Sequence, residues 1–136
     1  MNRTRILLAD DNRPLLEATA KLLASFFDIV GMARDGQEMI SKALLLTPDV
    51  IVADVTMPIM TGIEAAHQLR EAGLAARLVF LTIHSENEFI RACLAEGAWG
   101  YVIKSHMKDD LIPAIDAVMA GKLFVSPTLS MSEDLP

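Results

Sequence analysis

The stretch that decides the fold is P-D-V-I-V-A-D-V-T-M-P-I-M-T-G, residues 48–62. Residues 50–53 form a short apolar run rich in β-branched side chains, which is typical of a strand buried on both faces of a parallel sheet. The run ends on Asp54, and Pro58 and Gly62 then interrupt the chain before the next helical pattern begins. Ligands of open parallel sheets bind at the carboxyl ends of the strands, so Asp54 is a candidate site residue. A helix N-cap or a turn explains a lone aspartate equally well.

Polar side chains also end three other apolar runs. These are Asp10 and Asp11 after residues 6–9, Thr82 after residues 78–81, and Lys104 after residues 101–103. Adjacent carboxylates repel each other, and the A-D-D motif holds no Lys or Arg to neutralise them. A solvated turn is the simpler explanation, but clustered oxygen ligands with negative charge are what Mg²⁺ requires. Four strand ends that carry an acid pair, an acid, a hydroxyl and an amine favour a shared site over coincidence.

The hydrophobic periodicity predicts five strands that alternate with five helices. The strands are expected over about residues 5–9, 27–32, 50–53, 77–81 and 99–103, and the helices over about 14–26, 35–47, 62–73, 85–97 and 109–119. This alternation predicts a doubly wound α/β fold with a five-stranded parallel sheet in the order 2-1-3-4-5 and helices on both faces. In that order the first and third strands are neighbours, so Asp10, Asp11 and Asp54 are expected in one pocket.

Three side chains give sharper expectations about the helices. Phe26 is expected on the apolar face of the first helix, and Ser85 is expected to cap the fourth. Pro113 lies in the first turn of the last helix if that helix begins at Asp109 or Asp110. An earlier start would place Pro113 inside the helix, with the loss of a hydrogen bond and a kink.

Length and composition exclude several classes of protein. A chain of 136 residues is expected to form one domain with a single core. No apolar run approaches the roughly 18 residues of a membrane span, and the first one stops at Asp10, which is unlike a signal peptide. The single cysteine, Cys93, implies no disulfide and fits a reducing cytoplasm. The net charge of −6 argues against nucleic-acid binding by this chain.

Four motifs together resemble the receiver domain of two-component response regulators. They are A-D-D (9–11), D-V-T-M-P-I-M-T-G (54–62), L-T-I-H (81–84) and G-A-W-G-Y-V-I-K (97–104). The resemblance covers about residues 3–123, and the ending of the pattern is most similar to NarL/LuxR-type transcription regulators. The fold that it implies is CheY- or flavodoxin-like.

The resemblance implies a role for each polar strand end. Asp54 would be the phospho-acceptor, and Lys104 would pair with the phosphoryl group. Mg²⁺ would be held by Asp10, Asp11, Asp54 and the backbone carbonyl of Thr56. Thr82 would be the switch hydroxyl, and the Tyr101 side chain would move in response to it. Thr56 and His84, two residues after Asp54 and Thr82, are expected to flank the path of the water that removes the phosphoryl group. Taken alone, Tyr101 fits a half-exposed strand aromatic and Thr82 a strand-end hydroxyl.

The resemblance also implies partners and a place of action. A sensor histidine kinase would donate the phosphoryl group, and the domain would catalyse its own phosphorylation and dephosphorylation while acting mainly as a cytoplasmic switch. Residues 1–123 would form the receiver, and residues 124–136 would form a linker or tail that leads to a helix-turn-helix domain absent from this chain. Homodimerisation on phosphorylation is expected, whereas DNA or membrane binding by this chain alone is not.

Two departures from the family pattern and several rival classes bear on this interpretation. Many receivers carry a proline in a cis peptide after the lysine, where this chain has Ser105, so either packing stabilises a non-proline cis bond or the loop differs. Ile83 is bulkier than the usual residue after the switch hydroxyl and would narrow the mouth of the pocket.

A haloacid-dehalogenase-type hydrolase would need an acid two residues after its nucleophile, and a flavodoxin-like cofactor binder would need a Gly/Ser/Thr-rich phosphate loop; both features are absent. A degenerate receiver that acts without phosphorylation is the remaining alternative.

Overall fold

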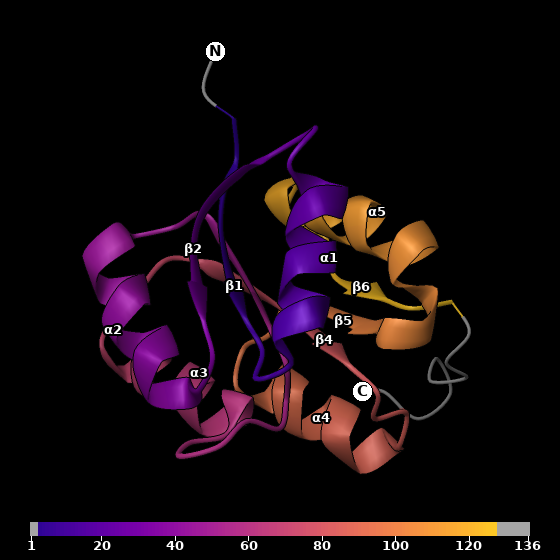
Figure 1. Ribbon diagram of the computed structural model, residues 1–136. Coiled ribbons are helices and arrows are strands. Elements are labelled where there is room, and N and C mark those ends of the chain that lie inside the picture. The colour runs from indigo at the N-terminus through magenta and orange to yellow at the C-terminus, as the bar shows by residue number, and fades with distance from the viewer. Residues whose placement is uncertain (1–2, 128–136) are drawn as a thin grey trace.

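The computed structural model describes residues 3–127, which form one parallel sheet of six strands between two layers of helices (Figure 1). The elements are β1 (Arg5–Ala9), α1 (Arg13–Leu23), β2 (Asp28–Ala33), α2 (Gly36–Leu46), β3 (Val50–Ala53), α3 (Gly62–Glu71), β4 (Arg77–Thr82), α4 (Asn87–Ala95), β5 (Gly100–Ile103), a 3₁₀ turn (Lys104–His106), α5 (Met107–Met119) and β6 (Phe124–Val125). The strand order is β2-β1-β3-β4-β5-β6. This arrangement confirms the predicted α/β fold and the order of its first five strands.

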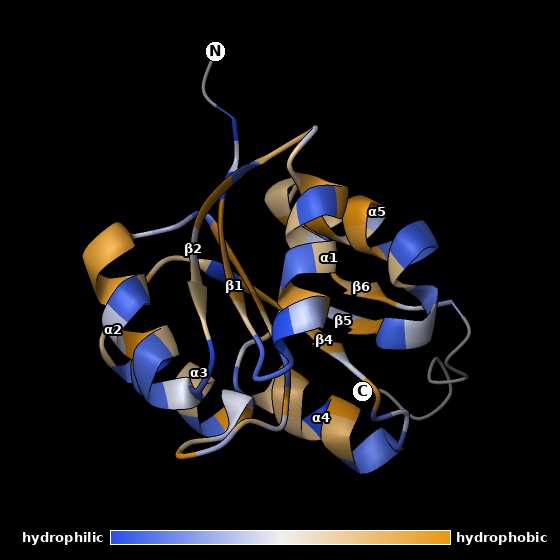
Figure 2. Ribbon diagram, viewed as in Figure 1, coloured by the Kyte–Doolittle hydropathy of each residue, from blue (hydrophilic) through white to orange (hydrophobic). Residues whose placement is uncertain are grey.

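The central strands are buried on both faces, as their unbroken apolar runs predict. Alternate side chains of one strand enter two separate cores. Leu7 belongs to the core under α2, α3 and α4, whereas Ile6 belongs to the core under α1 and α5. Figure 2 shows apolar residues along the central strands and mixed polarity on the helices. None of the helices formed by residues 3–127 combines the length and the apolar character needed to cross a membrane.

The sheet has one short strand more than the five that were expected. β6 is only two residues long and pairs in parallel with β5, where Phe124 lies opposite Gly100. The ladder then continues through a side chain, because the buried Ser126 hydroxyl accepts a hydrogen bond from the backbone N–H of Ile103 at 3.1 Å. The sheet thus extends beyond residue 123, where the receiver was expected to end. A two-residue strand is too short to give a period-two pattern in the sequence.

Two expectations about helix ends were wrong, and the open question of where the last helix begins is decided. Phe26 lies beyond the end of α1 and is 60% exposed, while its neighbour Phe27 is buried. The N-cap of α4 is Glu86 rather than Ser85, and it forms no side-chain capping bond. α5 begins at Met107 because the 3₁₀ turn runs directly into it, so Pro113 lies inside the helix and removes one backbone donor there.

The loop between β3 and α3 is folded tightly against the end of β3. The Gly62 N–H donates to the Val55 carbonyl at 2.8 Å, and a Cβ at position 62 would lie only 1.9 Å from the Asp54 carbonyl oxygen. Ile59 has a φ of 69° at the centre of a turn closed by the Met60 N–H and the Pro58 carbonyl, 2.7 Å apart. Gly62 is therefore required for the close approach that fixes the Asp54 backbone.

Candidate functional site

The carboxylates predicted to share a pocket lie together at the carboxyl edge of the sheet. β1 and β3 pair in register with Ala9 opposite Ala53, so the residues that follow them, Asp10 and Asp54, are neighbours. One carboxylate oxygen from each of Asp10, Asp11 and Asp54 lies within 4.8 Å of the other two. Asp10 and Asp54 are buried, at 5% and 7% exposure, whereas Asp11 is exposed.

Lys104 lies between the two buried acids. Its Nζ is 2.8 Å from Asp10 Oδ2 and 3.0 Å from Asp54 Oδ2. Burial raises the pKa of the Asp10 carboxyl, against the opposing hydrogen bonds from Lys104 and from the Asn12 N–H. Burial acts to lower the pKa of Lys104, but the hydrogen bonds to Asp10 and Asp54 outweigh it and raise that pKa above its ordinary value. The ammonium therefore stays charged at neutral pH and offsets part of the repulsion between the carboxylates.

The three acids are a chemically suitable site for a small divalent cation. Around an octahedral Mg²⁺ with oxygens at about 2.0–2.1 Å, ligand atoms lie roughly 3–4 Å apart. The separations of at most 4.8 Å among Asp10, Asp11 and Asp54 are close to this range and come from hard oxygen donors. This acidic cluster could hold a metal ion, and the described residues 3–127 contain no second group of His, Cys, Asp and Glu with that spacing.

The switch candidates lie on the neighbouring strands β4 and β5: Thr82 is the last residue of β4, and Tyr101 is the second residue of β5. Thr82 is buried, and its hydroxyl accepts a hydrogen bond from the His84 N–H at 3.2 Å. Tyr101 is fully buried rather than half-exposed, and its hydroxyl donates to the His84 carbonyl at 2.8 Å. Burial raises the pKa of Tyr101 well above its usual range. Both side chains thus contact the same short segment between β4 and α4.

A family model, the response regulator receiver domain, matches residues 6–116 of this chain. The chain belongs to this family.

The receiver is similar to NarL/LuxR-type proteins in sequence and in structure. It is 36% identical over 128 residues to the nitrate/nitrite response regulator protein NarL of Escherichia coli (strain K12), and the match covers 92% of this chain and 59% of NarL. The chain therefore spans about three fifths of the length of that relative. Among solved structures, a two-component response regulator of the LuxR family from Aurantimonas sp. SI85-9A1 is 33% identical, with a TM-score of 0.90 over 96% of this chain and 94% of that chain. The isolated REC domain of RcsB from Salmonella enterica serovar Typhimurium, in the presence of the phosphomimetic BeF₃⁻, is 25% identical, with a TM-score of 0.86 over 95% and 97% of the two chains.

These similarities make the chain a receiver domain of NarL/LuxR-type two-component response regulators, which typically control transcription. The loops of the receiver show both residues at which the chain departs from the family pattern. Residues 3–127 contain no cis peptide bond, so the loop after Lys104 differs from the proline-containing pattern and forms the 3₁₀ turn instead. Ile83 is 73% exposed, so most of its side chain lies in solvent.

The two residues expected to flank the path of water contact each other directly. A hydrogen bond of 2.7 Å joins Thr56 Oγ1 and His84 Nε2, and the Thr56 N–H lies 3.4 Å from Asp54 Oδ1. This bond, called the His84 bridge below, connects the loop after β3 with the loop after β4. Both residues were expected near the site, but their contact with each other was not, because no local pattern encodes a bond between residues 28 positions apart.

Sequence analysis also missed Phe89, which stacks on the His84 ring, and Asn12, whose N–H donates to Asp10 Oδ1 at 2.9 Å. Asn12 could have been found as the N-cap of α1, because Asn followed by Arg13 and Pro14 is a helix-start signal. Phe89 belongs to the apolar stripe of α4, and nothing in that stripe distinguishes a core residue from one that reaches the site.

Proposed function

We propose that Asp54 accepts a phosphoryl group from the phosphohistidine of a sensor histidine kinase in a Mg²⁺-dependent reaction. The observation that carries this proposal is the position of Asp54, which is buried beside Lys104 and within reach of two further carboxylates. An Asp54 carboxylate oxygen attacks the phosphorus, a P–O bond forms as the P–N bond breaks, and the kinase imidazole leaves. Because the reaction is mainly a matter of positioning and charge neutralisation, the chain needs no further covalent group.

Two cations have distinct roles in this mechanism. Mg²⁺ would be held by Asp10, Asp11, Asp54 and the backbone carbonyl of Thr56, and when bound it supplies positive charge to the phosphoryl oxygens. Lys104 already contacts Asp54 and keeps its positive charge at neutral pH, so it can pair with a phosphoryl oxygen on that side chain. With Mg²⁺ bound, the two cations would together offset the charge that the phosphoryl group adds to an acidic pocket.

The switch that follows depends on Thr82 and Tyr101. A phosphoryl oxygen on Asp54 is a new acceptor for the Thr82 hydroxyl, whose present partner is the His84 N–H. Movement of Thr82 would carry the segment to which the Tyr101 hydroxyl is bonded, and so change the surface formed by α4, β5 and α5. We assign Thr82 as the switch hydroxyl, Tyr101 as the aromatic that follows it, and Thr56 and His84 as residues that tune the loss of the phosphoryl group.

For the whole protein we propose control of transcription in the cytoplasm. Residues after the receiver would link it to a helix-turn-helix domain, and phosphorylation would act through the α4–β5–α5 face or the α1–α5 face, by homodimerisation or by release of the masked DNA-binding domain. The domain boundary that we propose follows Ser126 rather than residue 123, because Ser126 completes the edge of the sheet. With a net charge of −6, this chain should not bind DNA alone.

The test is phosphorylation of the purified chain with acetyl phosphate, followed by intact-mass spectrometry. One added phosphoryl group is expected with Mg²⁺, and none with EDTA or in Asp54→Asn; Asp35→Asn, which changes an N-cap at the start of α2, is the matched control that should still be labelled. Full labelling of Asp54→Asn would contradict the assignment. No labelling of the wild-type chain by acetyl phosphate or by a histidine kinase would favour the degenerate receiver.

A further inference from the structure

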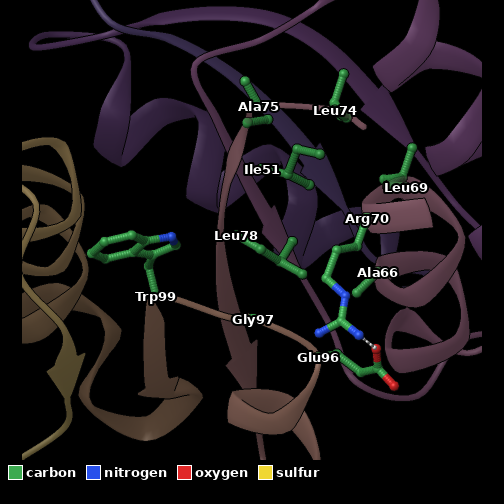
Figure 3. A pocket seen from close by; sticks show the side chains of 11 residues that line it. Ile51, Ala66, Leu69, Arg70, Leu74, Ala75, Leu78, Glu96, Gly97 and Trp99 are labelled. Atoms are coloured by element: carbon green, nitrogen blue, oxygen red, sulfur yellow. Dashed lines mark ion pairs between the residues drawn. The ribbon is translucent and has the colours of Figure 1, made fainter. Parts of the chain in front are cut away.

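α4 lies next to the phosphorylation pocket and has a small buried face. It is nine residues long, it buries only Ile90 and Cys93, and no side chain caps its N-terminus. Beyond its C-terminal end a hollow of about 220 Å³ opens between α3 and the loop that leads to β5, where Arg70 and Glu96 form an ion pair of 3.7 Å (Figure 3). α3 holds the C-terminal end of α4, because the Arg70 guanidinium also donates to the Ala95 carbonyl at 3.1 Å. The contacts of the first turn hold the opposite end of the helix.

The first turn of α4 contacts the pocket through His84. The Phe89 ring stacks on the His84 ring, with 4.1 Å between the centroids and 14° between the planes. The same imidazole forms the His84 bridge to Thr56 through Nε2, while Nδ1 lies 3.8 Å from a Glu86 carboxylate oxygen. Phe89 is the apolar contact that fixes the plane of this ring, because an ion pair at 3.8 Å does not orient it.

We propose that Phe89 is a positioning residue for the hydrolysis of phospho-Asp54, and that it acts by holding His84 in its bridge to Thr56. The inference rests on the proposed function of Asp54. The bridge connects the loops that follow β3 and β4, and the Thr56 N–H lies 3.4 Å from Asp54 Oδ1. The imidazole would thus lie between solvent and the mouth of a pocket in which the Asp54 side chain is only 10% exposed. Phe89 thereby makes the lifetime of the phosphoryl group depend on the position of α4.

The chemistry of the step determines the direction of the effect. In hydrolysis a water oxygen attacks phosphorus opposite the Asp54 oxygen; a new P–O bond forms as the acyl P–O bond breaks, the carboxylate departs with the electron pair, and a water proton passes to solvent. The attacking water must therefore enter from the mouth of the pocket. A ring held across the mouth excludes that water, whereas a ring released from Phe89 rotates and admits it.

The experiment measures the decay of phospho-Asp54 after removal of acetyl phosphate, by intact mass, in the presence of Mg²⁺. Phe89→Leu should shorten the lifetime threefold to tenfold, and Phe89→Tyr, which keeps the stacked ring, should restore it to within twofold of the wild type. Phe26→Leu, a change at an exposed phenylalanine outside α1, is the matched control and should have no effect. If Phe89→Leu does not fold, Phe89→Met removes the ring with less change in volume.

A double-mutant cycle with His84→Ala separates positioning from a general loss of packing. If Phe89 acts through His84, Phe89→Leu should change the decay less than twofold once His84 is absent. An equal acceleration in both backgrounds, or no acceleration in either, would overturn the inference while leaving phosphorylation of Asp54 intact. A wild-type chain that takes up no phosphoryl group would instead overturn the proposed function, and this inference with it.

Discussion

Replacement of Lys104 by methionine should destabilise the receiver by about 2–4 kcal/mol at pH 7.5. Lys104 is 15% exposed on its side chain and contacts Asp10 at 2.8 Å and Asp54 at 3.0 Å. Loss of one partner of a buried ion pair typically costs about 3–5 kcal/mol, because the remaining charge is left unpaired. Protonation of Asp10 can relieve part of this penalty, which places the expected loss somewhat lower.

The same change should have a defined dependence on pH. The folded-state pKa of Asp10 is already raised by burial, so the stability that this carboxyl contributes is present at low pH and is lost as the pH rises through that pKa. Without the Lys104 ammonium, the pKa of Asp10 rises further and the penalty at neutral pH grows. The difference in unfolding free energy between the wild type and Lys104→Met should therefore narrow between pH 7.5 and pH 5.

Urea denaturation measures both effects. With an m-value of about 1–3 kcal/mol/M, the midpoint for Lys104→Met should fall by roughly 1–2 M at pH 7.5. Mg²⁺ should recover more stability in this variant than in the wild type, because it replaces the missing positive charge. Lys122→Met, a change at an exposed lysine, is the control. A loss no larger than that of Lys122→Met, or an equal response to Mg²⁺, would refute the reasoning.

Three further changes follow from the geometry. Gly62→Ala should prevent folding or lower the free energy of unfolding by more than about 3 kcal/mol, because the added Cβ would lie 1.9 Å from the Asp54 carbonyl oxygen. A melting temperature within a few degrees of the wild type would show that the loop can rearrange to accept the side chain. Ser126→Ala should cost about 1–2 kcal/mol in urea denaturation, because the buried Ile103 N–H loses its acceptor, and a neutral result would mean that water replaces the hydroxyl. Asp11→Asn should weaken Mg²⁺ binding, measured by calorimetry, at least tenfold, or about 1.4 kcal/mol. The variant should still fold, because Asp11 is exposed. Unchanged Mg²⁺ affinity would show that Asp11 is not a ligand.

The carboxylate pocket could be predicted from the sequence because buried parallel strands give an unambiguous signal. The apolar run before Asp54 marks a strand buried on both faces, and the strand order then brings Asp10 and Asp54 together without any knowledge of side-chain packing. The position of Lys104 between the acids follows from the same logic, since β5 ends at the same edge of the sheet.

What the sequence did not predict depends on contacts between segments distant in the chain. β6 is stabilised by pairing with β5 and by the Ser126 hydroxyl, neither of which leaves a local pattern. The buried Tyr101 hydroxyl donates to the His84 carbonyl, and the strand pattern in the sequence does not predict this partner. The stack of Phe89 on His84 likewise depends on how α4 packs after the fold is formed.

The most direct test of the central claim is to locate the phosphoryl group chemically. The chain would be phosphorylated with acetyl phosphate and Mg²⁺, then treated with borohydride, which reduces an acyl phosphate to an alcohol and so converts the modified aspartate to homoserine. Peptide mass spectrometry identifies the converted position. The account predicts conversion at Asp54, dependent on Mg²⁺; conversion at Asp10 or at any other carboxylate, with Asp54 unchanged, would contradict it.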